Sequence, residues 1–286
     1  MSNTYPSYGI LSTDTFKNLR TAAARLDRYS KNFSADIANA GSAVTVGYED
    51  NISASLWNAT SGYTTADSVI SSTTVTLAEP YHVEVYLSPN EFKSYGESYI
   101  QGRMANVASG VFDEIRKKAL EKLVASATSV VANVSASAHN FNTVLSASTV
   151  LCNSGSQGAQ TFLCPRATYN ALLADAKNSN YQVSSTMGSG VESFQYNMLP
   201  NVTIVPETGL TTPIIATGDA VALAIRLPEQ MAGHARTIFA DVGQTEAAVA
   251  VDLFEDGVAG KVKMRAQACA GVATGRPGAA AKFTTP

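Results

Sequence analysis

The sequence feature that most constrains the fold is a long helix predicted over residues 97–131. Apolar residues recur there at helical spacing, namely Ile100, Met104, Val107, Val111, Ile115, Leu120, Leu123, Ala127 and Val130. No proline interrupts the segment, and at ~1.5 Å per residue the helix would extend about 50 Å. A helix of this length is either a spine on which sheets are arranged or a plain core helix of an α+β domain.

The exposed side of this helix is basic toward its end. The basic residues there are Arg116, Lys117, Lys118 and Lys122. Asp113 and Glu114 precede the first two lysines by four residues, a spacing that favours ion pairs on a helix surface.

Residues 44–80 have the pattern of an extended, two-stranded arm. Val44, Val46 and Tyr48 alternate with polar residues, residues 73–77 favour a second strand, and the segment between them is rich in Ser and Thr. A two-stranded ribbon has too small a core to be stable alone. We therefore expect the arm to lie on a larger surface.

The arm is also acidic and carries the lone tryptophan of the chain. Residues 33–91 contain no Lys or Arg. Their charged residues are Asp36, Glu49, Asp50, Asp67, Glu79, Glu84 and Glu91. Trp57, near the expected tip, requires a hydrophobic pocket either on its own arm or on another chain.

The remaining chain is predicted to mix helices and strands. A short helix is expected over residues 13–29, and Ser88 with Glu91 forms a capping box after a strand at 81–87. Further strands are predicted at 143–150, 161–163 and 202–205, strands or short helices at 213–216 and 221–225, and a helix after Pro165. Residues 245–270 are expected to form a closing hairpin, with strands at 248–254 and 261–269, that packs on the long helix. Residues 275–286 are expected to be loose.

The composition excludes several classes of protein. The net charge of −3 argues against a protein that holds nucleic acid by general electrostatics. No apolar run approaches the ~20 residues of a membrane span, and the N-terminus lacks the pattern of a signal peptide. The charged fraction of 15% is low and suits a protein that covers much of its surface with copies of itself.

The sequence contains no recognisable catalytic or metal-binding motif. GxSxG, P-loop and HExxH patterns are missing, and His82, His139 and His234 are far apart. Three isolated cysteines are expected to be small buried side chains without disulfide or metal roles. We therefore assign no catalytic, cofactor-binding or metal-binding residue, and expect no cofactor and no enzymatic activity.

The order of the predicted parts resembles that of one known family. A strand with its capping box (VEVYLSPNE, residues 83–91) precedes the long helix, a strand between prolines (LPNVTIVPETGL, residues 199–210) follows in the α/β region, and a hairpin closes the chain. From about residue 30 to residue 270, this order resembles the major capsid protein of tailed bacteriophages, which has the Hong Kong 97-type fold.

The resemblance implies an α+β fold with four parts. They are an N-terminal arm at 1–43, an E-loop at 44–80, a P-domain at 81–131 and 241–286, and an A-domain at 132–240. The P-domain would contain the spine helix at 97–131 and the closing hairpin at 245–270.

The resemblance also implies a function and a set of partners. The chain would assemble with itself, as hexamers and pentamers, into an icosahedral shell that encloses the phage genome without sequence-specific DNA binding. It would be built in the host cytoplasm and reside in the virion, with a portal, a separate scaffolding protein and no membrane partner. Some family members crosslink subunits through an arm lysine. This arm has none, so non-covalent cohesion is expected.

Three other classes of protein remain open at this point. An encapsulin shares the fold but encloses a cargo enzyme rather than DNA. A soluble α/β enzyme without a familiar motif would form only a small oligomer. A Ser/Thr-rich surface protein is disfavoured by the missing signal peptide.

The charge pattern leads to a hypothesis for the contact between subunits. The arm of one copy would lie across the basic part of a neighbour's helix, with apolar burial supplying most of the affinity. The arm residues are Trp57, Tyr63, Glu49, Asp50 and Asp67, and the helix residues are Arg116, Lys117, Lys118 and Lys122. Exposed ion pairs contribute little to affinity, so their expected role is to set register and reject wrong contacts.

Overall fold

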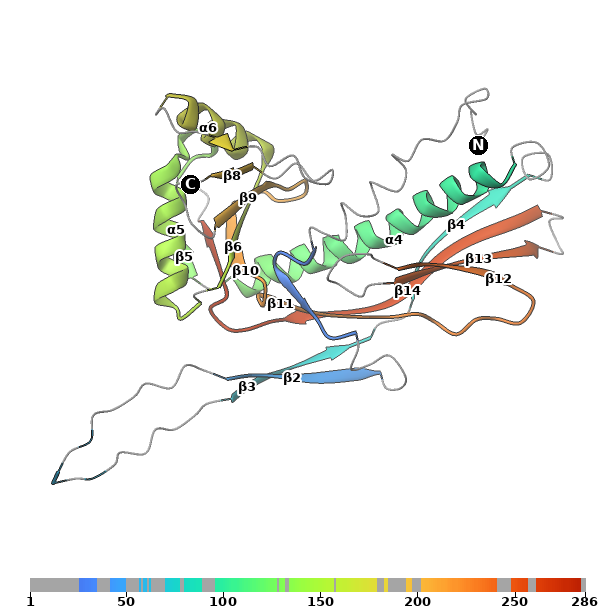
Figure 1. Ribbon diagram of the computed structural model, residues 1–286, viewed down its shortest axis with the longest axis horizontal. Coiled ribbons are helices and arrows are strands. Elements are labelled where there is room, and N and C mark those ends of the chain that lie inside the picture. Colours follow the sequence, from blue (N-terminus) through green and yellow to red (C-terminus); the bar gives the residue numbers. More distant parts are fainter. Residues whose placement is uncertain are drawn as a thin grey trace.

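The fold is a long helix on one sheet, joined at one end to a second sheet with its own helices (Figure 1). The computed structural model describes residues 26–34, 42–49, 57, 59–60, 62, 70–77, 80–88, 96–127, 129–131, 134–156, 158–178, 183–184, 194–196, 202–240, 248–256 and 261–283. Within these residues the strands form a six-stranded sheet, a seven-stranded sheet and a separate strand pair. The α+β class predicted from the sequence is confirmed. The helix expected over residues 13–29 falls mainly outside the described residues.

Helix α4 (Gly96–Ser126) is the predicted long helix, although it ends five residues earlier than expected. The chain continues into strand β5 (Ser129–Val131), which pairs in parallel with β15 (Ala280–Phe283). The β-branched residues Val130 and Val131 are suited to a strand. The prediction that the helix continues to residue 131 was therefore wrong, because the last of its expected residues form a strand of the seven-stranded sheet.

The six-stranded sheet supports α4. Its strands are β1 (Ser30–Asn32), β4 (Tyr81–Leu87), β11 (Val221–Arg226), β12 (Ala235–Ala240), β13 (Ala248–Asp256) and β14 (Lys261–Thr274). The 14-residue β14 pairs with β4 and β13 along its first half and with β11 along its second half. The predicted closing hairpin is confirmed, and its return strand extends four residues past residue 270.

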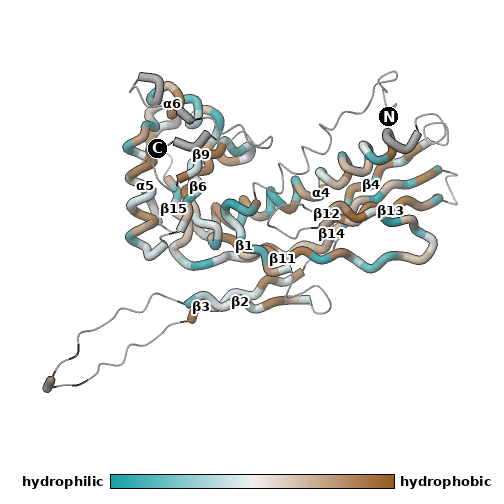
Figure 2. The backbone as a smooth tube through the Cα atoms, viewed as in Figure 1, coloured by the Kyte–Doolittle hydropathy of each residue, from teal (hydrophilic) through white to brown (hydrophobic). Residues whose placement is uncertain are grey.

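The main hydrophobic core lies between α4 and this sheet. Val111, Ile115 and Leu123 of the helix are buried in one cluster with Met264 and Ala266 of β14. Every second residue of β14 points to α4 because strand side chains alternate between faces. Figure 2 shows apolar segments recurring along α4 and along the strands beside it. Full burial of each large aliphatic side chain contributes about 1.5–3 kcal/mol.

The seven-stranded sheet has two helices on one face. Its remaining strands are β6 (Gln160–Cys164), β7 (Val183–Ser184), β8 (Phe194–Tyr196), β9 (Val202–Pro206) and β10 (Ile214–Thr217). The other elements are the 3-10 turn η1 (Ala136–Ala138), α5 (Phe141–Asn153) and α6 (Arg166–Asn178). A second core joins Leu151 and Leu172 of the helices to Phe162 and Ile204 of the sheet. The predicted helix after Pro165 and the strands near 161 and 202 are confirmed.

The strand predicted at residues 143–150 is wrong, because this segment belongs to α5. Asn140 and Thr143 form a capping box, with the Thr143 amide donating to the Asn140 side chain at 3.1 Å. The buried residues Val144, Ala147 and Leu151 then follow at helical spacing. The β-branched residues of the segment favour a strand. The capping box and the helical spacing of the buried apolar residues stabilise a helix instead.

The C-terminal segment is also more ordered than predicted. Residues 275–286 were expected to be loose, yet β15 inserts between β5 and β10 of the seven-stranded sheet. Ala281 and Phe283 are buried there.

Strand pairing also places β11 and β12 in the sheet under α4, although they lie within the expected A-domain range of 132–240. Within the described residues the chain therefore crosses between the two sheets three times, from β4 through α4 to β5, from β10 to β11 and from β14 to β15.

The root of the arm packs on its own subunit. Strands β2 (Ala43–Glu49) and β3 (Ile70–Thr76) form the antiparallel pair expected for the arm. Val46 and Val75 pack with Ala222 and Ala224 of β11 in a third, smaller core. These alanines point away from α4, so the arm root and α4 cover opposite faces of the same sheet.

A glycine permits this close approach, which leads to a stability prediction. A Cβ at Gly271 would lie 2.5 Å from the Thr76 carbonyl oxygen. Gly271→Ala should therefore displace the arm root and lower the free energy of unfolding by about 1–3 kcal/mol, measured by denaturant titration of unassembled subunits. Gly158→Ala is the matched control, since a Cβ there meets nothing within 4 Å. Equal stability of the two variants would contradict this packing.

Burial of His139 leads to a second prediction. The His139 ring packs edge-on against Phe283, with the ring centroids 4.9 Å apart. Burial lowers the pKa of His139 below 6.5, and a hydrogen bond with the Val134 backbone raises this pKa by a smaller amount. Between the folded pKa and 6.5, the unfolded chain binds a proton that the folded chain excludes. The free energy of unfolding should therefore fall as the pH drops below 6.5. In His139→Gln it should fall less steeply. Denaturant titration between neutral and mildly acidic pH measures both slopes. Parallel profiles would contradict this.

Candidate assembly surfaces

The basic segment of α4 is more engaged within its own subunit than the sequence indicated. The Arg116 side chain is only 10% exposed and forms an ion pair with the fully buried carboxylate of Glu207, while Asp113 lies 3.4 Å away. A buried ion pair stabilises only while both partners remain. Arg116 therefore links α4 to the segment after β9, and little of it is accessible to a neighbour.

The two central lysines of this segment also have partners on the helix. The Lys117 ammonium lies 2.6 Å from a Glu114 oxygen, and Lys118 lies 2.8 Å from Glu121, which raises the lysine pKa. These contacts are exposed and span three residues rather than the predicted four. Lys122 is exposed as well. The basic residues of this helix segment therefore lie beside about as many carboxylates, so the net charge around the segment is small.

The described part of the arm exposes large apolar side chains. Trp57 is 61% exposed and Ile70 is 60% exposed, and Glu49 is exposed on β2. Tyr63, Asp50 and Asp67 lie outside the described residues. Exposed aromatic and aliphatic side chains on a thin strand pair are typical of a surface that is covered in an assembly.

Sequence analysis missed a basic and aromatic surface on the sheet itself. Lys261 and Lys263 of β14 both place their ammonium groups over the Tyr86 ring of β4, at 5.7 and 5.0 Å from its centroid. Beside them Arg265 lies over Phe254 at 4.9 Å and pairs with Glu84. The alternation of basic residues in β14 was visible in the sequence. Their aromatic partners depend on the register of the predicted hairpin of β13 and β14 and on the pairing of β14 with β4, neither of which the sequence indicated.

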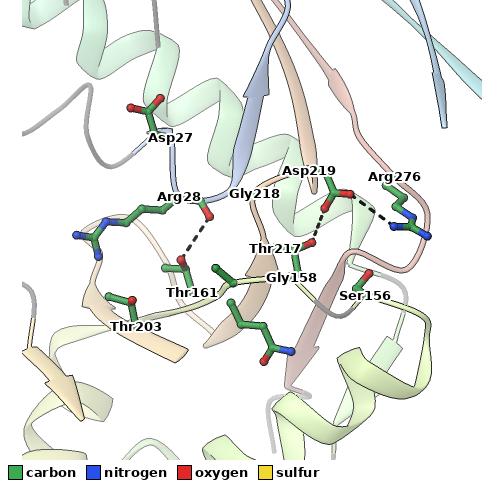
Figure 3. A pocket seen from close by; sticks show the side chains of 12 residues that line it. Asp27, Arg28, Ser156, Gly158, Thr161, Thr203, Thr217, Gly218, Asp219 and Arg276 are labelled. Carbon is green, nitrogen blue, oxygen red and sulfur yellow. Dashed lines mark hydrogen bonds and ion pairs between the residues drawn. The ribbon is translucent and has the colours of Figure 1, made fainter. Parts of the chain in front are cut away.

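A cavity of about 500 Å³ lies where the N-terminal segment meets the β10–β11 turn (Figure 3). Its polar groups bond to one another: the Thr161 hydroxyl donates to the Arg28 carbonyl at 3.3 Å, and Asp219 accepts from Thr217 and faces Arg276 at 3.9 Å. These contacts join the two sheets at one of the chain crossings. The lining therefore has a structural explanation without a ligand.

Among the other titratable side chains of the described residues, Arg236 and Asp252 form a buried ion pair at 2.7 Å. Cys164 and Cys269 are buried as predicted, and burial raises the pKa of the Cys164 thiol to about 12. Cys152 is exposed, contrary to expectation. No group of three or more His, Cys, Asp or Glu residues is arranged to hold a metal ion among the residues described. Among these residues there is also no helix long and apolar enough to span a bilayer.

Comparison by sequence finds no relatives, whereas comparison by structure finds many. No protein-family model matches the chain, and no curated protein matches it. A structure from Mycobacterium phage Che8 covers 91% of this chain and 90% of its own, with a TM-score of 0.58 at 17% identity. The mature capsid of bacteriophage PhiM1 covers 100% and 91%, with a TM-score of 0.54 at 8% identity.

A shell protein of another kind is equally similar. The SrpI encapsulin from Synechococcus elongatus covers 98% of this chain and 91% of its own, with a TM-score of 0.59 at 9% identity. The chain thus has an α+β fold shared by phage capsids and an encapsulin. This is the Hong Kong 97-type fold of tailed-phage major capsid proteins that the sequence resemblance predicted.

The buried ion pair of α4 leads to a third prediction. Glu207→Gln removes the buried carboxylate beside Arg116 and leaves only the half-exposed Asp113 near this charge. The free energy of unfolding of unassembled subunits should therefore fall by about 3 kcal/mol. Glu114→Gln removes an exposed partner of Lys117 and should leave stability nearly unchanged. Denaturant titration of both variants measures the difference. If Glu207→Gln were as stable as Glu114→Gln, the internal role of Arg116 would be refuted.

Proposed function

We propose that the protein is the major capsid protein of a tailed double-stranded DNA phage. The observation that carries this proposal is the likeness to phage structures over nearly the whole chain, 91% of it for Che8. A likeness of this extent is not confined to one part of the fold, because only about 9% of the chain lies outside it. We infer a structural rather than a catalytic role, since the cavity described above is explained by contacts that hold the chain together.

The physical basis of assembly is an arm that projects from its own subunit. Its root is held by the third core, while Trp57 and Ile70 remain exposed. Water contact by such side chains is unfavourable by roughly 25 cal/mol per Å² of apolar surface. The arm therefore gains stability by crossing to a neighbouring copy, and a closed icosahedral shell repeats that contact many times. Because residues 33–91 contain no lysine, the shell is held without lysine crosslinks from the arm.

The basic part of α4 remains a partner for the acidic arm in this proposal. Lys117, Lys118 and Lys122 are accessible to the arm of a neighbour, whereas the burial of Arg116 limits it to an indirect role. The existing pairs with Glu114 and Glu121 would have to open or be shared.

The proposed partners follow from a container function. Copies of the chain form hexamers and pentamers, a separate scaffolding protein guides their curvature, and a portal provides entry for DNA. A net charge of −3 suits a shell that confines DNA rather than one that binds it tightly. Assembly in the host cytoplasm and residence in the virion complete the proposal.

An encapsulin is the second candidate function, favoured by the likeness to the SrpI encapsulin over 98% of this chain. Such a shell would enclose a cargo enzyme. The contents of shells made in the native host distinguish the two: packaged DNA supports the phage capsid, and a protein cargo without DNA supports the encapsulin. Negative-stain electron microscopy that found only small oligomers, with or without a scaffolding protein, would refute both.

The exposed tryptophan of the arm leads to a fourth prediction. Trp57→Ser should fold with unchanged secondary structure and stability, because the side chain is 61% exposed in the subunit, but should yield few or no shells. Sedimentation and electron microscopy measure the yield. Trp57→Phe is the matched variant, which retains an aromatic anchor and should assemble. Normal shells from Trp57→Ser would count against an arm that anchors to its neighbour.

A further inference from the structure

The position of β15 in the seven-stranded sheet is the strongest feature without an assigned role. We call the position between β5 and β10 that β15 occupies the strand slot. Residue 281 pairs there with residue 129 on one side and with residue 215 on the other. The strand is therefore far along the chain from both of its neighbours. Pairing of this kind forms late in folding, because a long loop must close before the contacts are made.

The walls of the strand slot are held by contacts that do not involve β15. On one side β10 pairs with β6, and β6 pairs with β9. Helix α5 packs on both β5 and β10. Leu151 and Leu172 of the helices belong to the same core as Phe162 and Ile204 of the sheet. The remainder of the sheet and its helices therefore shape the slot from outside the strand that fills it.

β15 itself adds one large side chain to the sheet. Residues 279–281 are alanines, which favour strands weakly and add only small side chains to the two cores. Phe283 is buried and packs edge-on against the rings of His139 and Phe162, at 4.9 and 5.9 Å between centroids. Segments with few apolar contacts open at a lower free energy than the core of a domain. Release of β15 thus exposes one aromatic ring and leaves the core between α4 and β14 in place.

The segment before β15 is anchored beside the strand slot. The Arg276 amide donates to the Asp219 carbonyl at 2.8 Å, and the two side chains face each other at 3.9 Å (Figure 3). Gly278, at φ 76°, turns the chain into the strand, and its carbonyl accepts from the Ser154 hydroxyl at 2.8 Å. A strand released from the slot therefore stays tethered next to it, which gives it a high effective concentration.

Docking of β15 fixes the second sheet to the end of α4. Strand β5 follows α4 directly in the chain, and it pairs with β15. The Lys282 ammonium donates to the Val124 carbonyl in the last turn of α4 at 3.4 Å. The Phe283 amide donates to the Pro213 carbonyl at 3.2 Å. A closed shell repeats one subunit shape, so a subunit whose two sheets are not fixed to each other is a poor building block.

We propose that the strand slot is a docking site for an extended peptide segment, and that β15 enters it last and makes the subunit competent for shell assembly. Before docking, the core of α4 and β14 is formed and the strand is tethered outside the slot. After docking, Phe283 closes the second core. The assembly half of this inference rests on the proposed shell function, whereas the docking half does not.

A full-length variant that rejects its own strand tests the docking site. Ala281→Glu places a carboxylate in the second core, where Ala281 is 0% exposed. Amide hydrogen exchange in unassembled subunits should become about tenfold faster or more in β5, while α4 and β14 stay protected. The matched control, Leu145→Glu, adds the same charge on the exposed side of α5 and should leave exchange unchanged.

A second variant keeps this test decisive if the buried charge is too disruptive. Phe283→Ala removes only the ring and should show the same pattern of exchange more weakly. Loss of protection in α4 and β14 as large as that in β5, in both variants, would mean that β15 does not separate from the main core. That result overturns the proposal.

A synthetic peptide of residues 278–286 should fill the slot that Ala281→Glu vacates. Anisotropy of the fluorescently labelled peptide should show binding to the variant and none to unmodified subunits, whose slot β15 occupies. The same peptide carrying the Ala281→Glu change is the control and should bind about tenfold more weakly or less. Lack of peptide binding by a variant that keeps its main core overturns the docking site.

Shell yield decides the assembly half of the inference. Ala281→Glu should form few shells, measured by sedimentation and electron microscopy, and the peptide should restore them. Normal shells without the peptide overturn the role of β15 in assembly even where the peptide binds. If the unmodified chain forms no shells, the proposed function fails, whereas hydrogen exchange and peptide binding still decide the docking site.

Discussion

The packing of α4 on β14 is the contact on which the rest of the structure depends. β14 is the longest strand described, with 14 residues, and it pairs with β4, β13 and β11. Its alternate side chains form the main core with the helix. A single strand thus fixes the direction of the helix, the order of the sheet and, through its continuation into β15, the position of the second sheet.

The two faces of β14 have different roles because strand side chains alternate. One face packs against α4 and stabilises the subunit through apolar burial. The opposite face receives the arm root at Gly271 and presents charged and aromatic side chains toward Lys261. Both faces therefore contribute to the stability of the subunit. A substitution on the helix side removes apolar burial from the main core, whereas Gly271→Ala on the opposite side displaces the arm root.

Periodicity made most elements predictable from the sequence. The long helix, the hairpin and the paired strands of the arm were expected from apolar spacing, and element order led to the correct fold. The errors occurred where a local pattern was ambiguous. Residues 143–150 include four β-branched residues but follow a helix cap at Asn140. The small, weakly patterned residues before Phe283 became a strand only because β5 and β10 offer edges for pairing.

The sequence by itself determined the class of fold, the acidic character of the arm and the missing lysine, since these depend on composition and short-range spacing. It did not determine which residues surround each cation. Arg116 is buried against Glu207, whereas Lys261 and Lys263 lie over Tyr86, and both arrangements join residues distant in the chain. Pairing, burial and the neutralisation of charge depend on three-dimensional neighbours, and so only the tertiary structure decided them.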